Sequence, residues 1–107
     1  LVSKINGCDY CLTYHQNFMV EAGLSSPDAE AVVADYKTAP ITDAEKKLLA
    51  YAEKVTLHAY KTTDADVEGL KECGWSEGQI LEATLVVGLF CDINRWVDAL
   101  GFRYEDD

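Results

Sequence analysis

The sequence predicts an all-α fold: one domain over residues 1–107, built as a bundle of about five helices. Two observations predict it. Residues that start and end helices recur along the chain, and the alternating pattern of strands is nearly absent. Hydrophobic residues make up 49% of the chain, and 107 residues are enough for one hydrophobic core. We therefore expect helices with short connections packed around a single core.

The first half of the chain carries the signals for two helices. Asn6-Gly7 interrupts the chain, and residues 8–22 then run without glycine or proline as far as Gly23. Ser26-Pro27-Asp28 supplies a helix N-cap, a proline at the first helical position and an acidic residue in the first turn. The helix that begins there is expected to reach Tyr36.

The second half carries three further helix starts. Residues 42–45 (TDAE) match the capping-box pattern, and apolar residues then recur at helical spacing: Leu48, Leu49, Ala52, Val55 and Ala59. Residues 63–66 open a short helix that Gly74 ends. Residues 76–79 form another capping box, which starts the longest helix, residues 77–100.

This longest helix has no polar face. Apolar residues occupy nearly every side of it: Ile80, Leu81, Leu85, Val86, Val87, Leu89, Phe90, Ile93, Trp96 and Val97. Such a helix lies either at the centre of a bundle or between subunits. In a chain of this size we expect both, and we therefore predict a homo-oligomer.

The two ends of the chain differ. Residues 1–5 resemble the end of a helix already under way, because Leu1, Val2 and Ile5 share one face. A natural chain rarely starts inside an element, so we expect an N-terminal segment upstream of these residues. The acidic segment YEDD, residues 104–107, is expected to form an exposed tail.

The chain is strongly acidic, with 19 Asp and Glu residues against 9 Lys and Arg residues and a formal net charge of -10. This charge repels phosphate backbones and anionic membrane surfaces, so we expect neither a nucleic acid nor a membrane as partner. The longest apolar run, residues 85–91, is far shorter than the roughly 20 residues that span a bilayer. No signal peptide is visible, so we expect a cytoplasmic protein with its four cysteines in a reducing compartment.

The segment CDYCLTYH, residues 8–15, places two cysteines and a histidine at helical spacing. On a helix that begins near Cys8, Cys11 lies about 60° around the axis from Cys8, and His15 lies about 20° from Cys8. The three side chains therefore share one face. The helix N-terminus favours an exposed, low-pKa thiolate at Cys8, whereas His15 is positioned to accept the proton of Cys11. The motif predicts an activated dithiol in which either cysteine could attack.

The same residues allow other interpretations. A structural zinc site needs four ligands, and Cys73, Cys91 or His58 would have to complete it. The two cysteines and His15 could also simply pack in the core. Haem attachment is excluded, because it needs a histidine directly after the second cysteine, where this chain has Leu12. The dithiol is the leading prediction because CxxC in a reducing compartment is more often catalytic than structural, and it requires no cofactor.

Three stretches of the chain carry a family resemblance: INGCDYCLTYH (5–15), LLAYAEKVT (48–56) and GWSEGQILEATLVVGLFCDINRWVDALG (74–101). They resemble the carboxymuconolactone decarboxylase and alkylhydroperoxidase AhpD-like superfamily, most closely its branch of peroxidase-related enzymes. Their order matches that of the family, and they cover nearly the whole chain. The resemblance implies an AhpD-like all-helical domain that assembles as a trimer or hexamer.

The resemblance also implies a peroxidase in which Cys8 and Cys11 cycle between dithiol and disulfide, with His15 in the proton relay as a base toward Cys11. The implied partners are a hydroperoxide substrate and an external dithiol reductant, lipoyl or thioredoxin-like. In better-studied relatives a glutamate about three turns before the first cysteine completes the relay, a position absent from residues 1–7. Glu53 and Glu82 are candidate replacements, or parts of solvated helix faces.

Two other functions stay open. The domain could be a redox-sensing or structural oligomer whose disulfide changes helix packing without turning over a substrate. It could also bind a metal ion at Cys8, Cys11 and His15. Peroxide turnover, a change of oligomeric state without turnover, and stoichiometric zinc would distinguish the three.

Overall fold

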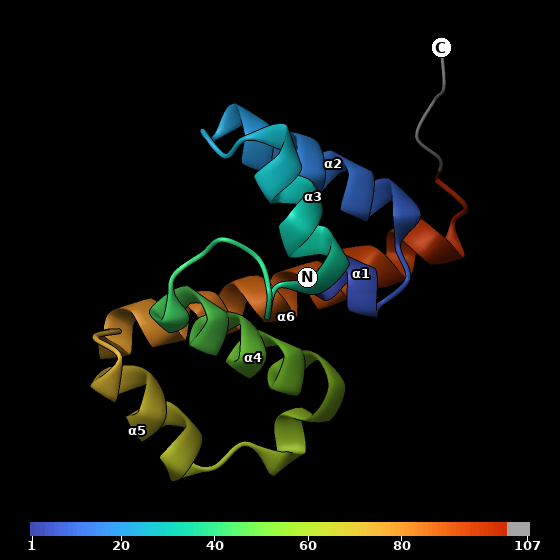
Figure 1. Cartoon of the computed structure of the whole chain (residues 1–107). Helices are drawn as coiled ribbons and strands as arrows, with labels where there is room; N and C mark the ends of the chain where they lie inside the picture. The colour runs from blue at the N-terminus through green and yellow to red at the C-terminus, as the bar shows by residue number, and fades with distance from the viewer. Residues whose placement is uncertain (103–107) are drawn as a thin grey trace.

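The computed structural model describes residues 1–102, and all regular structure in this range is helical (Figure 1). The predicted all-α fold is confirmed. The predicted helices correspond to α2 through α6, and the helical segment expected at the start of the chain is α1. The expected acidic tail, residues 104–107, lies outside the described residues. The elements are α1 (Val2–Ile5), α2 (Asp9–Glu21), α3 (Ser26–Asp35), α4 (Asp43–His58), the 3-10 helix η1 (Ala59–Lys61), α5 (Asp64–Glu72) and α6 (Glu77–Ala99).

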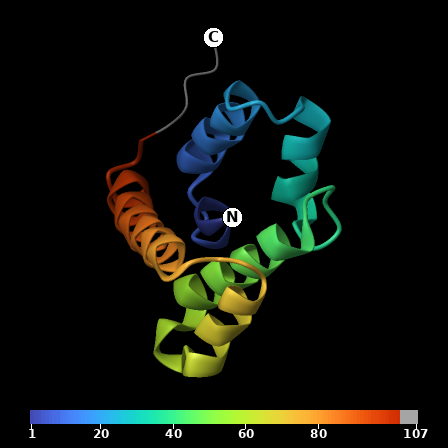
Figure 2. The same ribbon diagram turned by 90° about the vertical axis from the view of Figure 1, so that its left-hand side faces the viewer.

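The long helix α6 organises the molecule, since α1, α2, α4 and α5 all contact it. In Figure 1, α2 and α3 lie to one side of α6, and α4 and α5 lie to the other. Figure 2 shows the short α1 in the middle of a ring formed by the longer helices. Helix α1 contacts α2, α4 and α6, and its Ser3 is buried. These contacts hold α1 at the centre of the molecule.

The capping residues place most helix starts where the sequence predicts them. Thr42 and Glu45 make both bonds of a capping box at α4, and Ser76 and Gln79 do the same at α6. The predicted start of α3 is wrong by one residue. Its N-cap is Ser25, whose Oγ accepts a hydrogen bond from Asp28 N at 3.2 Å. Pro27 consequently lies in the first turn, where its missing N–H is no loss.

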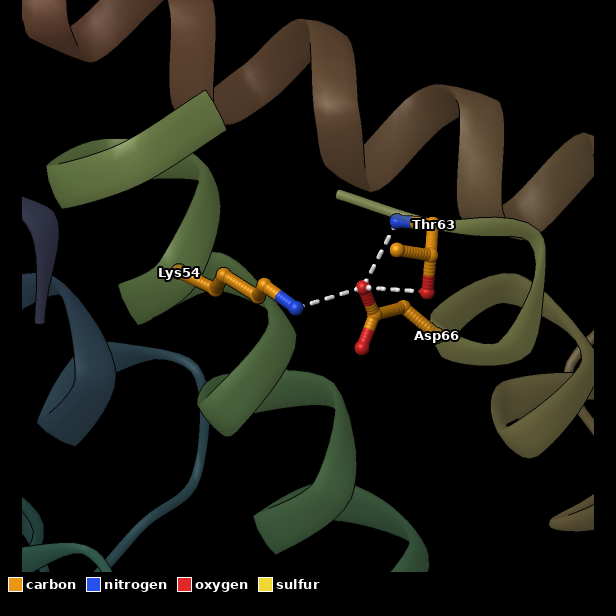
Figure 3. A network of polar contacts seen from close by, with 3 residues as sticks. All are labelled: Lys54, Thr63 and Asp66. Atoms are coloured by element: carbon orange, nitrogen blue, oxygen red, sulfur yellow. Dashed lines mark hydrogen bonds and ion pairs between the residues drawn. The ribbon is translucent and has the colours of Figure 1, made fainter. Parts of the chain in front are cut away.

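Two lysines fasten helices to one another. Lys54 of α4 pairs with Asp66 of α5, with Nζ and Oδ2 2.7 Å apart, and the same oxygen accepts a hydrogen bond from Thr63 N at 2.8 Å (Figure 3). Lys4 of α1 donates to carbonyls at the end of α3, those of Val33 and Ala34. A cation at a helix C-terminus satisfies carbonyls that have no partner within the helix.

Helix α6 is apolar almost all round, as expected, but within residues 1–102 its buried side chains lie on one face. Ile80, Val87 and Val97 are buried. Leu81, Leu85 and Leu89 are 60%, 64% and 54% exposed. These three leucines recur every four residues and form the leucine stripe of α6, bordering a shallow hollow. Within residues 1–102, no helix is both long and apolar enough to span a bilayer.

Candidate active site

The cysteine pair lies where the chain turns into α2. Gly7 adopts a φ of 73°, a conformation that favours glycine, and it directs the chain into the helix. Cys8 is the N-cap of α2, and its Sγ accepts a hydrogen bond from Cys11 N at 3.4 Å. The predicted position of Cys8 at the start of a helix is confirmed. Its neighbour one turn on, Cys11, has its Cα 5.3 Å away, and the two side chains form a disulfide.

The pair is covered rather than exposed. Cys8 is 1% exposed and Cys11 is 4% exposed, and both pack against Val97 of α6. Tyr10 and Ile93 complete this small cluster. The expectation of an exposed thiol at Cys8 is wrong, because α6, which comes from the other half of the chain, packs at the start of α2 through Val97. A reaction at these sulfurs therefore requires that α2 move locally against α6, or that a reactant reach them by a path that the cluster does not block.

His15 lies two turns along α2 and is half-buried. Its Nδ1 is 3.2 Å from Ser3 Oγ, and its ring meets that of Phe90 edge-on at a centroid distance of 4.5 Å. Burial lowers the pKa of His15 below its usual value. Within residues 1–102, the hydrogen-bond partner of His15 is Ser3 and not Cys11.

A buried polar network continues from Ser3. Asn94 Nδ2 donates to Ser3 Oγ at 3.1 Å, and Asn6 Nδ2 donates to Asn94 Oδ1 at 3.1 Å. Asn6 Nδ2 also lies 3.5 Å from Cys91 Sγ. Ser3 is 3% exposed and Asn94 is 1% exposed. Sequence reasoning missed this network. One signal for it exists, because Asn94 repeats the seven-residue spacing of the buried Ile80 and Val87 on α6.

A cavity of about 550 Å³ opens beside His15. Ser3 and His15 both line it, whereas Cys8 and Cys11 do not. Most of the remaining wall is apolar and comes mainly from α1, α4 and α6: Val2, Leu48, Leu49, Ala52, Ala83, Val86, Val87 and Phe90, with Leu1 and Trp75 from outside these helices. Gln79 and Glu82 supply the other polar groups. The cavity suits a mainly apolar ligand with a polar group near His15.

The other candidate residues do not gather at the cysteines. Glu53 accepts a hydrogen bond from Tyr36 OH at 2.6 Å, and burial together with this carboxylate raises the pKa of Tyr36 to about 12. Glu82 reaches the cavity wall. His58 is exposed at the end of α4 and meets the ring of Tyr60.

The remaining cysteines stand apart from the pair. Cys73 is an exposed free thiol, and Cys91 is half-buried beside Asn6. Among residues 1–102, no group of three His, Cys, Asp or Glu side chains is arranged to hold a metal ion. The structure therefore brings together Cys8 and Cys11 as one pair at the start of α2, and His15 of α2 with Ser3 of α1 as another.

The fold and the site define a class of protein: a helical domain with a bridged CxxC pair at a helix N-terminus, one turn before a half-buried histidine. No protein-family model matches the chain, and no curated protein matches it. Solved structures do match, and the chain has the AhpD-like superfamily fold that the sequence predicts.

Two solved structures illustrate the match. An uncharacterized peroxidase-related protein from Silicibacter sp. TM1040 superposes with a TM-score of 0.91 and 29% identity, over 95% of this chain and 53% of that one. An alkylhydroperoxidase AhpD core from Ralstonia eutropha JMP134, also an uncharacterized peroxidase-related protein, gives a TM-score of 0.93 and 26% identity, over 98% of this chain and 55% of that one. The chain spans about half the length of both.

Proposed function

We propose that this chain is a thiol-dependent hydroperoxidase in which Cys8 and Cys11 cycle between dithiol and disulfide. The observation that carries the proposal is the bridge between Cys8, the N-cap of α2, and Cys11 one turn later. The names of the two matching structures, both peroxidase-related, agree with it. The substrate is a hydroperoxide, and an external dithiol, lipoyl or thioredoxin-like, resets the pair.

In the reduced protein, Cys8 is the better candidate for the attacking thiolate. The helix N-terminus stabilises negative charge, and the Cys11 N–H points at Cys8 Sγ. The thiolate attacks the terminal peroxide oxygen, the O–O bond breaks, and the alkoxide leaves as an alcohol after taking up one proton. The resulting sulfenic acid then reacts with the Cys11 thiol, which forms the S–S bond and releases water.

The external reductant completes the cycle by thiol–disulfide exchange. Its thiolate attacks one sulfur of the bridge, and its second thiol then releases the mixed disulfide, so that two electrons and two protons pass to the pair. Because both cysteines are buried in a cluster with Val97, this step depends on opening the contact between α2 and α6. The reductant can therefore reach the disulfide only while α2 and α6 are apart at this contact.

We further propose that copies of this chain associate through the leucine stripe of α6, as a homotrimer or hexamer. The three leucines are more than half exposed and lie beside the hollow formed by Gly78, Glu82 and Val86. A ridge of residues four apart, packed beside a groove on the same helix, allows a second α6 to interlock with the first. A second copy thus offers the apolar surface that the stripe lacks within the chain.

One observation favours a second function, that of a non-catalytic redox sensor. Both sulfurs are buried, and neither lines the cavity beside His15. In that case peroxide oxidises the pair once and changes the packing of α2 on α6, without sustained turnover. The difference between the two functions lies in the number of peroxide molecules consumed per chain.

Peroxide consumption in the presence of dithiothreitol tests the proposal. We expect many equivalents of tert-butyl hydroperoxide to be reduced per chain, and loss of this activity in Cys8→Ser and in Cys11→Ser. Cys73→Ser is the matched control, because it removes an exposed thiol away from the site and should retain full activity. Oxidation that stops after one equivalent indicates the sensor. Equal turnover in all four proteins would refute both functions.

A further inference from the structure

The buried network of Asn6, Asn94, Ser3 and His15 is a single line of hydrogen bonds with a direction. Asn6 donates to Asn94, and Asn94 donates to Ser3. Both bonds measure 3.1 Å. The last link joins Ser3 Oγ to His15 Nδ1 at 3.2 Å. The Asn94 amide accepts through its oxygen on the Asn6 side, which leaves its nitrogen to donate on the Ser3 side. The direction of the first bond therefore determines the direction of the next.

This direction decides which atom donates in the last link. Ser3 Oγ accepts from Asn94, and a hydroxyl group has one proton of its own to donate. Among residues 1–102, the acceptor within reach of that proton is His15 Nδ1. Ser3 is 3% exposed, so bulk water does not compete for the hydroxyl proton. His15 Nδ1 is therefore an acceptor, and neutral His15 carries its proton on the other ring nitrogen, Nε2.

We propose that Ser3 and Asn94 are positioning residues that hold neutral His15 with its proton on Nε2, as a hydrogen-bond donor at the apolar cavity. His15 and Ser3 both line that cavity. The lowered pKa of His15 agrees with a neutral ring at physiological pH. Glu82 places a carboxylate on the wall of the same cavity.

This assignment changes the role of His15 in catalysis, a consequence that rests on the proposed hydroperoxidase function. The sequence suggested a base toward Cys11, but a ring whose Nδ1 already accepts from Ser3 is not a free base at that nitrogen. An Nε2–H donor instead stabilises negative charge that develops on a substrate oxygen during O–O cleavage. The donor keeps its proton, so the alkoxide takes its proton from the thiols or from water.

The protonated ring nitrogen can be measured directly by NMR on ¹⁵N-histidine-labelled protein at mildly alkaline pH. Long-range ¹H–¹⁵N correlations separate the protonated from the unprotonated nitrogen, and His58→Gln identifies the exposed histidine. We expect Nε2 of His15 to be protonated in the unmodified chain. A proton on Nδ1 would overturn the proposal, because it requires the line of hydrogen bonds to run in the opposite direction.

Asn94→Asp tests the direction with almost no change of shape. A carboxylate accepts from Ser3 and cannot donate, so Ser3 then accepts from His15 Nδ1–H. We expect the proton to move to Nδ1 and the pKa of His15 to rise. An unchanged tautomer in a folded Asn94→Asp chain refutes the assignment.

Ser3→Ala provides a second variant if the buried charge of Asn94→Asp prevents folding. It removes the donor to Nδ1, and the His15 signals should shift toward those of exposed His58. Unchanged His15 signals contradict the proposal. The NMR spectra test the protonation of His15 and do not depend on peroxide turnover. The cysteine variants test the hydroperoxidase function by turnover. Either proposal can therefore fail while the other holds.

Discussion

Val97→Ala tests whether the contact of α6 with the cysteine pair controls access to the disulfide. Val97 is 2% exposed and packs on both Cys8 and Cys11. Removing two buried methyl groups costs about 1.6 kcal/mol of transfer free energy at about 0.8 kcal/mol each. A residual cavity of roughly 50 Å³ adds about 1 kcal/mol at about 24 cal/mol per Å³. We therefore expect the free energy of unfolding to fall by about 2.5 kcal/mol.

The same change should make the disulfide easier to reduce. If reduction takes place from a locally opened state, its rate follows the population of that state. Since about 1.4 kcal/mol is a factor of ten, a loss of 1.4 to 2.5 kcal/mol from the closed state speeds reduction by about 10-fold to 70-fold. The assay is reduction by dithiothreitol in native buffer, quenched by alkylation and followed by mass spectrometry, beside urea unfolding of the oxidised protein.

Val87→Ala is the matched control. It is the same substitution on the same helix, at a residue that is 4% exposed and lies outside the cysteine cluster. We expect it to destabilise the fold while leaving the rate of reduction nearly unchanged. Equal acceleration in both variants would mean that reduction requires global unfolding. A destabilised Val97→Ala chain with an unchanged rate of reduction would show that the contact does not limit access, and would refute the reasoning.

Three further predictions concern acid stability, assembly and the core. The Lys54 ion pair lowers the pKa of Asp66 in the folded protein. The stabilisation that this carboxylate provides is therefore present above pH 3.8 and is lost as the pH falls through the folded pKa. In urea unfolding at a series of pH values, Asp66→Asn should show a smaller loss of stability at acid pH. Leu85→Glu, at an exposed site, should dissociate the oligomer in light scattering while changing stability by at most about 0.5 kcal/mol. Tyr36→Phe leaves Glu53 without its donor and should cost about 1–3 kcal/mol in thermal or urea unfolding.

Each of the three has a result that would contradict it. A steep acid limb retained in Asp66→Asn would assign acid unfolding to other carboxylates. An unchanged mass for Leu85→Glu, from an unmodified chain that is itself oligomeric, would place the interface elsewhere. Unaltered stability in Tyr36→Phe would mean that solvent replaces the hydroxyl at Glu53.

The helix starts were predictable because their signals are local. In a capping box, a threonine or serine and the Glu or Gln three residues later each accept a hydrogen bond from the other's backbone N–H. Thr42 and Ser76 therefore mark the starts of α4 and α6 without reference to the rest of the chain. The start of α3 shows the limit of such signals. Ser25 and Ser26 are chemically equivalent caps, and the extended backbone at Ser25 decides between them. The proximity of Cys8 and Cys11 was predictable for the same reason, because it depends only on their spacing at the start of one helix.

The surroundings of the motif were not predictable, because they come from distant parts of the chain. Cys8 is covered by a valine of α6, and His15 bonds to a serine of α1 instead of a cysteine of its own helix. Helical spacing tells which side chains share a face, but not what that face meets. Asn94 could have been noticed as a polar residue in a buried register, yet its partner Ser3 is separated from it by 91 residues.

The position of α1 has a consequence for how the site comes into being. Helix α1 contacts α2, α4 and α6, and its Ser3 is buried, so this side chain reaches its final surroundings only once these helices have packed. Ser3 meets Asn94 across a separation of 91 residues, a contact of the kind that closes late in folding because its loop is long. A partly folded chain can hold the CxxC turn of α2 but not an oriented His15. The cysteines can thus exist as a simple oxidisable pair in a partly folded chain, and the oriented histidine is added only when α1 and α6 have met.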